Sequence, residues 1–455
     1  MQKVFTEFIR QAPLKLPIKT RPLFRQAWPI LLSNCSIPLL GLVDTAVLGH
    51  LPDGRFLAAV ALGAVVFSFL YWGFGFLRMG TTGLVAQAFG RQDSAAMGRL
   101  IMQALYLALA LGLALQLLRP AIPFMLRWLD GSPEASELAT GYVAIRLWSA
   151  PAVLMQYVVL GVALGIARSQ VVLVLLVLAN TINILLDLSF VMGLGMTSNG
   201  VALASLIAEW VAALVGLYWL VKTCRELNIP LQRPPLNFKA TQTLIKVNAD
   251  LFVRTLALLF ALAFFTRQGA TQGDTTLAAN AVLMQLIMLT SYMLDGFAQA
   301  VEGQFGAAFA RSKKEALEVF NAGVVLSVAT GLLLTLLLWL GGYQLIKFLT
   351  DLAEVRALAA IYLPWLWLVV PVSIACYLLD GVFVGATWTA AMRTSLLVSL
   401  AGYLLAWWLL QGFNNHGLWA AFLIFNALRG LSLGWVLYIR MKQNPYIEKL
   451  RSHKK

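Results

Sequence analysis

The sequence predicts an all-α polytopic membrane protein with twelve transmembrane helices in two pseudo-symmetric six-helix lobes. The first observation is composition: 60% of the 455 residues are apolar and only 12% are charged, whereas an average globular domain has about 25% charged residues. So few charged side chains cannot solvate two or three soluble domains. The other two observations are a series of long apolar runs and an internal repeat.

Twelve apolar runs reach the length of about 20 residues that a helix needs to cross a bilayer. The first run is not expected to be a cleavable signal, because its basic amino-terminal flank is long and no small-residue cleavage site follows a short apolar core. The predicted spans are 26–50, 57–82, 99–118, 138–165, 171–195, 199–221, 247–266, 276–302, 317–341, 358–386, 394–411 and 417–439.

Basic residues between the spans predict the orientation in the membrane. With twelve spans both termini lie on one side, and the segments on that side carry 24 Lys and Arg residues against 6 on the other side. Segments rich in Lys and Arg stay in the cytoplasm. We therefore expect a protein integral to the cell (inner) membrane with both termini cytoplasmic. The net charge of +14 then marks a membrane face and no nucleic-acid partner.

The spans divide six from six around a polar segment that contains three prolines, Pro230, Pro234 and Pro235. Such a composition is typical of a linker between lobes. The predicted organisation is a cytoplasmic amino-terminal tail (1–25), a first lobe (26–221), a cytoplasmic linker (222–246), a second lobe (247–439) and a cytoplasmic basic tail (440–455).

An internal repeat relates the two lobes. A single offset of 220 residues aligns two segments that are some 60 residues apart, although Gly and Ala are common in membrane helices and coincidence is the alternative. Repeats of six helices both begin on the same side, so they are parallel repeats, an arrangement that secondary transporters use. The offset brings Gly83, Ala88, Phe89 and Arg91 onto Gly303, Ala308, Phe309 and Arg311, and Pro151, Gly161 and Gly165 onto Pro371, Gly381 and Gly385.

Two carboxylates lie inside the membrane in the first lobe. Asp44 is 18 residues into the first span and Asp187 is 16 residues into the fifth, and both spans run outward, so the two acids share a depth. Asn180, Asn183 and Asp187 lie on one helical face. A buried carboxylate can bind a proton, because burial disfavours its charged form, and such oxygens also suit Na⁺, a hard cation. We interpret this set as a coupling-ion site; the alternative is a structural hydrogen-bond network.

The second lobe has acids at other positions. Asp295, Glu302 and Asp380 lie toward the cytoplasmic ends of their spans, where they could line a cytoplasmic vestibule or simply snorkel to the interface. Asp250 and Arg254 are four residues apart on one helix. The spacing predicts that these two side chains neutralise each other.

Two prolines interrupt the first span. Pro29 and Pro38 each remove an internal hydrogen bond and favour a kink. Because Pro38 precedes Asp44 by six residues, a bent helix that carries a titratable acid is a candidate moving part. A static kink is the alternative.

Several function classes lose support from the sequence. No GxxxxGK[ST] motif occurs, and no soluble domain could hold a nucleotide. The three histidines and three cysteines are scattered without metal-ligand spacing. We expect no enzyme and no cofactor, apart from a coupling ion.

Four segments resemble the multidrug and toxic compound extrusion (MATE) transporters, and in particular their DinF-like branch. They are PLLGLVDTAVLGHL (38–51), FLRMGTTGLVAQAFG (76–90), NILLDLSFVMGLG (183–195) and RTLALLFALAFFTRQGA (254–270). The resemblance implies a twelve-helix, two-lobe antiporter that exports bulky, often cationic or amphipathic compounds in exchange for H⁺ or Na⁺.

The resemblance also implies site residues. The first-helix acid of the family corresponds to Asp44, the fifth-helix pair to Asn183 and Asp187, and a sixth-helix hydroxyl to Ser205, so that Na⁺ would bind among these four. The bending proline corresponds to Pro29. NorM-like relatives have acids in the seventh and tenth helices.

The second lobe matches that pattern only in part. Asp380 corresponds to the tenth-helix acid, but Arg254 lies near the seventh-helix position. This departure favours coupling through the first lobe. We expect a proton-coupled antiporter, and Na⁺ is the alternative coupling ion. The protein is expected to act as a monomer in the lipid bilayer on small drug-like molecules. A lipid or lipid-linked intermediate flippase is the alternative function.

Overall fold

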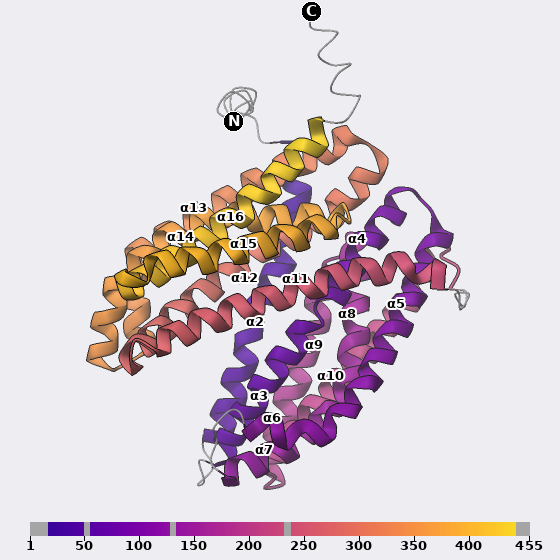
Figure 1. Cartoon of the computed structure of the whole chain (residues 1–455). Coiled ribbons are helices and arrows are strands. Elements are labelled where there is room, and N and C mark those ends of the chain that lie inside the picture. The colour runs from indigo at the N-terminus through magenta and orange to yellow at the C-terminus, as the bar shows by residue number, and fades with distance from the viewer. Residues whose placement is uncertain (1–16, 50–54, 128–132, 232–237, 443–455) are drawn as a thin grey trace, which may run out of the picture.

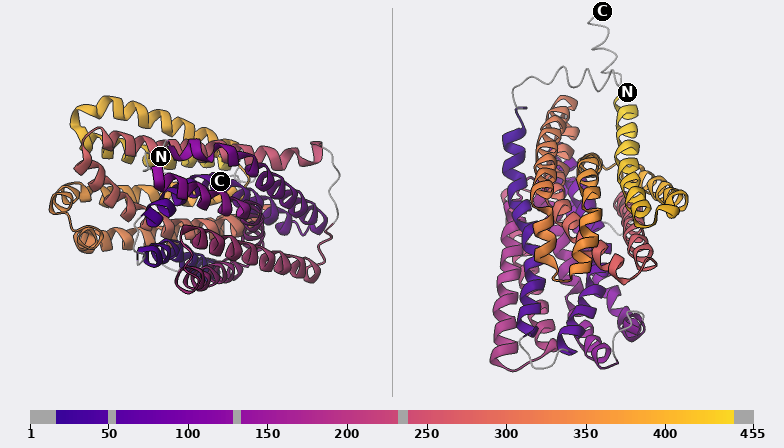
Figure 2. Two further views of the ribbon diagram at one scale, coloured as in Figure 1. Left: turned by 90° about the horizontal axis from the view of Figure 1, so that it is seen from below. Right: turned by 90° about the vertical axis from the view of Figure 1, so that its left-hand side faces the viewer.

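A computed structural model describes residues 17–49, 55–127, 133–231 and 238–442. Helices dominate this part of the chain, and it contains no β-strand. The helices form two bundles, indigo to magenta and rose to yellow in Figures 1 and 2. The prediction of an all-α protein is therefore confirmed.

The first lobe contains helices α2 to α10. Short 3₁₀ turns join α5 to α6 and α7 to α8, and a π turn extends α9. Their bounds are α2 Thr20–Gly49, α3 Arg55–Gly73, α4 Phe76–Gly90, α5 Ser94–Ala114, α6 Ile122–Arg127, α7 Pro133–Arg146, α8 Ala150–Gly165, α9 Gln170–Asp187 and α10 Ser198–Glu226.

The second lobe contains six long helices. Pro364 and Pro371 lie inside α14, which nevertheless continues through both of them. The bounds are α11 Phe238–Ala270, α12 Asp274–Arg311, α13 Lys313–Leu349, α14 Ala353–Gly385, α15 Thr389–Leu410 and α16 Asn414–Lys442.

Within the described residues each predicted span coincides with one or two of these helices, although 171–195 runs beyond them at Leu194 and Gly195. The described residues include ten helical stretches that are long and apolar enough to cross a membrane. One of them, Thr389–Arg440, contains α15 and all but the last two residues of α16. Helix α2, 30 residues long, covers the first predicted span. Two predicted spans are divided in the structure: α3 and α4 are separated at Phe74 and Gly75, and α7 and α8 at the 3₁₀ turn Leu147–Ser149.

Apolar side chains also cover the outside of the molecule. On α13, Leu332, Leu336 and Leu340 are 56%, 48% and 61% exposed. A soluble monomer rarely exposes a contiguous apolar face, so these side chains face lipid. The chain is an integral membrane protein.

The internal repeat is visible in the contacts between the lobes. A methyl group at Gly83 of α4 would lie 2.2 Å from the carbonyl oxygen of Val384 on α14. The equivalent group at Gly303 of α12 would lie 2.0 Å from the carbonyl oxygen of Leu164 on α8. Each residue of the second pair is 220 positions from its counterpart in the first. The two lobes therefore cross through a pair of symmetry-related contacts in which only glycine fits.

A third contact lies between equivalent residues. Gly306 of α12 is the counterpart of Ala86 of α4, and a Cβ added at Gly306 would lie 2.9 Å from the Cβ of Ala86. A residue that meets its own counterpart lies on the symmetry axis. The pseudo-two-fold axis thus passes between α4 and α12.

The turns after α8 and α14 are equivalent as well. Ala167 and Thr387, again 220 residues apart, have φ angles of 60° and 55°, which non-glycine residues adopt uncommonly. Their N–H groups donate to the carbonyl oxygens of Leu164 and Val384 at 3.0 and 2.9 Å. These are the same two carbonyls that meet the glycines of the other lobe, so one capping motif presents both of them.

The lobes touch on the side at which α2 begins and α16 ends, which we call the terminal side. The glycine contacts lie in the last turns of α4, α8, α12 and α14, all of which end on this side. Toward the opposite side the bundles diverge (Figure 1). The molecule is therefore closed at the terminal side and spreads away from it.

Candidate substrate cavity and ion site

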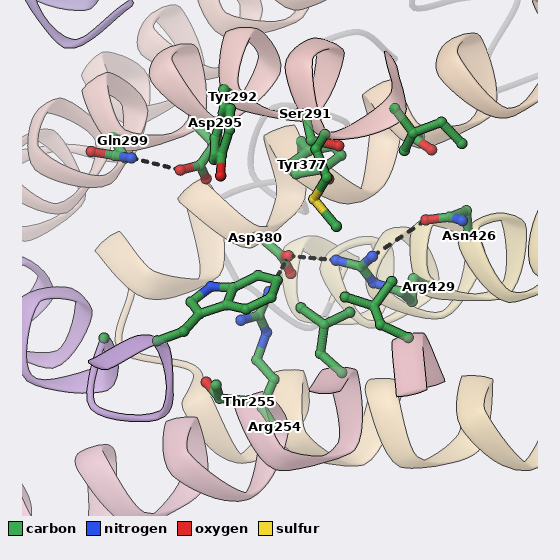
Figure 3. A pocket seen from close by; sticks show the side chains of 18 of the residues that line it. Arg254, Thr255, Ser291, Tyr292, Asp295, Gln299, Tyr377, Asp380, Asn426 and Arg429 are labelled. Carbon is green, nitrogen blue, oxygen red and sulfur yellow. Dashed lines mark hydrogen bonds and ion pairs between the residues drawn. The ribbon is translucent and has the colours of Figure 1, made fainter. Parts of the chain in front are cut away.

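A cavity of about 560 Å³ lies between the lobes. Helices α2, α3, α4 and α8 contribute to it from the first lobe, and α11, α12, α14 and α16 from the second. Figure 3 labels lining side chains of the second lobe. Most of the lining is apolar or aromatic, as in sites that bind small organic molecules. Its charged lining residues are Arg78, Arg254, Asp295, Glu302, Asp380 and Arg429.

Two arginines share one carboxylate in the second-lobe wall. Arg254 of α11 and Arg429 of α16 both donate to Oδ2 of Asp380 on α14, Arg429 at 3.0 Å. Arg429 also donates to the side-chain oxygen of Asn426 at 3.3 Å and lies over the ring of Phe425 at 5.6 Å. All three charged side chains are largely buried but reach the cavity.

The predicted pairing of Asp250 with Arg254 is wrong. Asp250 instead accepts from Arg393 at 2.5 Å and from Thr389 at 3.0 Å, both on α15. Residues four apart on a helix can meet, but here the two side chains pack against different neighbouring helices. Arg254 consequently pairs with Asp380, 126 residues away, a contact that local spacing cannot predict.

The other two acids predicted for a vestibule also line the cavity. Asp295 accepts from Gln299, one turn further along α12, at 2.6 Å. Glu302 accepts from Arg78 of α4 at 3.1 Å and is buried. Because Arg78 and Glu302 belong to different lobes, their ion pair joins the lobes next to the glycine contacts. Their assignment to a cytoplasmic vestibule, with that of Asp380, stays a prediction.

The polar set of the first lobe lies between α9 and α10. Asn183 and Ser205 are 3.2 Å apart, from Nδ2 to Oγ. With its amide turned over, Asn183 would accept from Ser205 and donate to Asp187 Oδ2 at 3.0 Å. Asp187 is fully buried. Three of the predicted ion-site residues thus meet in one buried cluster. None of the three is among the described residues that line the cavity.

Asn180 connects this face of α9 to α2. Its side-chain nitrogen lies 3.4 Å from Ser36 Oγ. The side chain of Asp44 lies outside the residues whose side chains the structure describes, and so does that of Pro38. Pro29 is buried, and its carbonyl accepts from Ser33 at 2.8 Å; α2 is one continuous helix past both prolines.

A largely buried ion pair within the first lobe was not predicted from the sequence. Arg146 of α7 donates to Glu209 of α10 at 3.2 Å and to the hydroxyl of Tyr142 at 2.8 Å. Its guanidinium also lies 4.9 Å from the centre of the Phe67 ring. An intramembrane acid and base of opposite charge were the only signal, and their pairing could not be assigned without the fold.

The described residues contain no group of three His, Cys, Asp or Glu side chains that could hold a metal ion.

A family model described as MatE matches residues 29–189 and 252–408, well over half of the chain. The chain belongs to the MATE family. MATE proteins are transporters and not enzymes, and this one is a member of a multidrug-efflux transporter family.

Similar sequences agree with that membership. The MATE chain is 42% identical over 416 residues to the DNA damage-inducible protein F of Escherichia coli strain K12. This alignment covers 91% of each of the two chains. It is 21% identical over 362 residues to the multidrug export protein MepA of Staphylococcus aureus strain NCTC 8325, covering 78% of this chain and 77% of MepA. The resemblance to the DinF-like branch is therefore confirmed.

Solved structures share the fold. A MOP superfamily transporter from Pyrococcus furiosus superposes with a TM-score of 0.83 at 22% identity, covering 94% of this chain and 96% of that one. A multidrug resistance MATE family transporter in an outward-facing conformation gives 0.81 at 21% identity, with the same coverage. The two-lobe, twelve-helix architecture predicted for this MATE chain is the architecture of these neighbours.

Proposed function

We propose that this MATE transporter is a secondary antiporter that exports amphipathic organic compounds from the cytoplasm in exchange for protons. The proton would bind at the cluster of Asp187, Asn183 and Ser205, together with Asp44. Substrate would bind in the cavity between the lobes. The cavity can be completed by one chain, which supports a functional monomer.

The observation that carries this proposal is the position of α2 between the two sites. Asn34 of α2 lines the cavity and donates to the backbone carbonyl of Tyr292 in the second lobe at 2.9 Å. Two residues further on, Ser36 contacts Asn180 on the polar face of α9. A change in α2 would therefore reach the cavity and the polar face of α9 that carries Asp187, which is what coupling requires.

The register of α2 and α9 supports a shared role for the two acids. Both helices run away from the terminal side, and the contact between Ser36 and Asn180 aligns them. Asp44 is eight residues beyond Ser36 and Asp187 seven beyond Asn180. At a rise of 1.5 Å per residue these steps are about 12 and 10.5 Å, so the two backbones are level.

The orientation belongs to the proposal. We assign the terminal side to the cytoplasm, because Lys and Arg are concentrated in the segments on that side. The lobes are then closed toward the cytoplasm and spread toward the outside, as expected for a state that releases substrate. In a bacterial cell such a protein would reside in the inner membrane.

Everted membrane vesicles test this proposal. With ΔpH and ΔNa⁺ imposed separately, we expect an acidic lumen alone to drive accumulation of an organic dye, tested with cationic ethidium and anionic N-dansylglycine. Asp187→Asn should abolish accumulation, whereas Asp274→Asn, at an exposed acid in the first turn of α12, should not. Transport driven only by ΔNa⁺ would assign the cluster to Na⁺, and lipid scrambling without either gradient would indicate the flippase.

A further inference from the structure

We propose that Arg254 and Arg429 form a binding site for the anionic group of an amphipathic substrate, a carboxylate, sulfonate or phosphate attached to an apolar body. This inference rests on the proposed export function and specifies the substrate class of its cavity. The resemblance implied compounds that are often cationic or amphipathic; the inference selects amphipathic compounds with a negative charge.

The three Arg and three Asp or Glu residues that line the cavity sum to zero, but Asp295 belongs to neither of its two ion-pair groups, so the charge is unevenly distributed. Arg78 and Glu302 neutralise each other in the ion pair between the lobes. Arg254, Asp380 and Arg429 form a cluster of two guanidiniums around one carboxylate, with a net charge of +1. A guanidinium cannot lose its proton in a protein, so the surplus positive charge is permanent.

The two arginines retain donors for a ligand. Each guanidinium has five N–H donors in a fixed fork, and both arginines use Nη2 on the same oxygen of Asp380. The further hydrogen bond of Arg429 goes to Asn426. Forked guanidinium donors match the oxygens of carboxylates and phosphates. An anion in the cavity would therefore complete the coordination of both arginines.

The surroundings of this cluster fit an amphipathic molecule. Phe422, Phe425, Leu258, Leu262 and Met284 line the same cavity on α11, α12 and α16. These side chains offer apolar and adaptable contacts next to the charged group. Asp295, on α12, carries a negative charge into the cavity and is bonded to Gln299; it disfavours a second anionic group and would tolerate a cationic one.

A matched pair of probes tests the charge preference. N-dansylglycine is an anion and dansylcadaverine a cation with the same fluorophore, so dansyl fluorescence reports the binding of each to the full-length protein in lipid nanodiscs. We expect the protein to bind N-dansylglycine about tenfold more tightly, because one charge-assisted hydrogen-bonded group is worth roughly that factor. Equal affinity, or preference for the cation, would overturn the proposal.

Two substitutions then change the cluster charge in opposite directions. Arg429→Gln lowers it from +1 to 0 and should weaken N-dansylglycine binding about tenfold, whereas Asp380→Asn raises it to +2 and should strengthen binding. In each variant the affinity for dansylcadaverine should stay unchanged or change in the opposite direction to that for N-dansylglycine. A purely structural role would weaken both probes in both variants, and that result contradicts an anion site.

A control and a lipid probe complete the experiment. Arg356→Gln removes an arginine that pairs with exposed Asp351, about 36 Å along α14 from Asp380, and should change neither affinity. Dansyl-labelled phosphatidylglycerol distinguishes a lipid headgroup from a free organic anion: binding of the lipid in preference to N-dansylglycine would contradict a soluble amphipath. Loss of charge preference with intact gradient-driven transport refutes this inference alone, whereas absence of transport refutes the proposed function.

Discussion

Gly303→Ala should force the lobes apart on the terminal side. The added Cβ would lie 2.0 Å from the carbonyl oxygen of Leu164, and ordinary contact begins at 3.4 Å, so the backbones must separate by about 1.4 Å. That carbonyl is held by a hydrogen bond in its own turn and cannot rotate away. Overpacking of this kind costs about 1–3 kcal/mol, and each 1.4 kcal/mol changes a population tenfold.

The closed terminal side should therefore lose about tenfold or more in population relative to arrangements with the lobes apart. Spin labels at Ala95 of α5 and Lys314 of α13, both exposed and on different lobes, report the separation by pulsed electron paramagnetic resonance, after the three native cysteines are replaced by alanine. Gly341→Ala is the control, because nothing lies within 4 Å of a Cβ there. We expect a longer and broader distance distribution in Gly303→Ala only. An unchanged distribution would refute the account of the crossing.

Three further predictions concern other contacts. Arg146→Met should lower the unfolding free energy by about 3 kcal/mol, because the largely buried carboxylate of Glu209 loses its partner. In thermal unfolding the double variant Arg146→Met/Glu209→Met should be more stable than Arg146→Met alone, and a less stable double variant would contradict this. Asp250→Asn should lower the unfolding free energy by about 1–2 kcal/mol, since its bonds to Arg393 and Thr389 on α15 lose their charge. No shift in the same thermal assay would contradict this. A spin-label pair at the ends of α2 and α11 that lie away from the terminal side should report a shorter distance at low pH, where a protonated Asp44 no longer needs hydration. Asp44→Asn should abolish this pH dependence. A distance that does not change with pH would indicate that the prolines of the first span make no moving part.

Much of the fold could be predicted from the sequence, because lipid imposes a simple rule on span length and side-chain polarity. The repeat was also accessible, since the glycines of the crossing, such as Gly83 and Gly303, survive in both halves at one offset. The breaks within spans were not: Pro151 at the start of α8 coincides with a break, whereas Pro364 and Pro371 do not interrupt α14. Packing by neighbouring helices decides that difference.

The candidate sites were predictable only where their residues share a helix. Asn183 and Asp187 could be grouped because their spacing fixes a common face, and the family resemblance added Ser205. The pairs Arg254–Asp380 and Arg78–Glu302 join residues 126 and 224 positions apart. Sequence spacing carries no information on such contacts, so local pairing rules assigned Arg254 to the wrong acid.

Coupling by the first lobe and substrate recognition by the second lobe can be separated in everted vesicles with an imposed ΔpH and no ΔNa⁺. The measurement compares proton-driven accumulation of N-dansylglycine in Asp187→Asn and Asp380→Asn at matched expression. We expect no gradient-driven accumulation in Asp187→Asn, and retained accumulation with altered affinity in Asp380→Asn. Retained coupling in Asp187→Asn together with its loss in Asp380→Asn would overturn this division of roles and assign the coupling site to the second lobe.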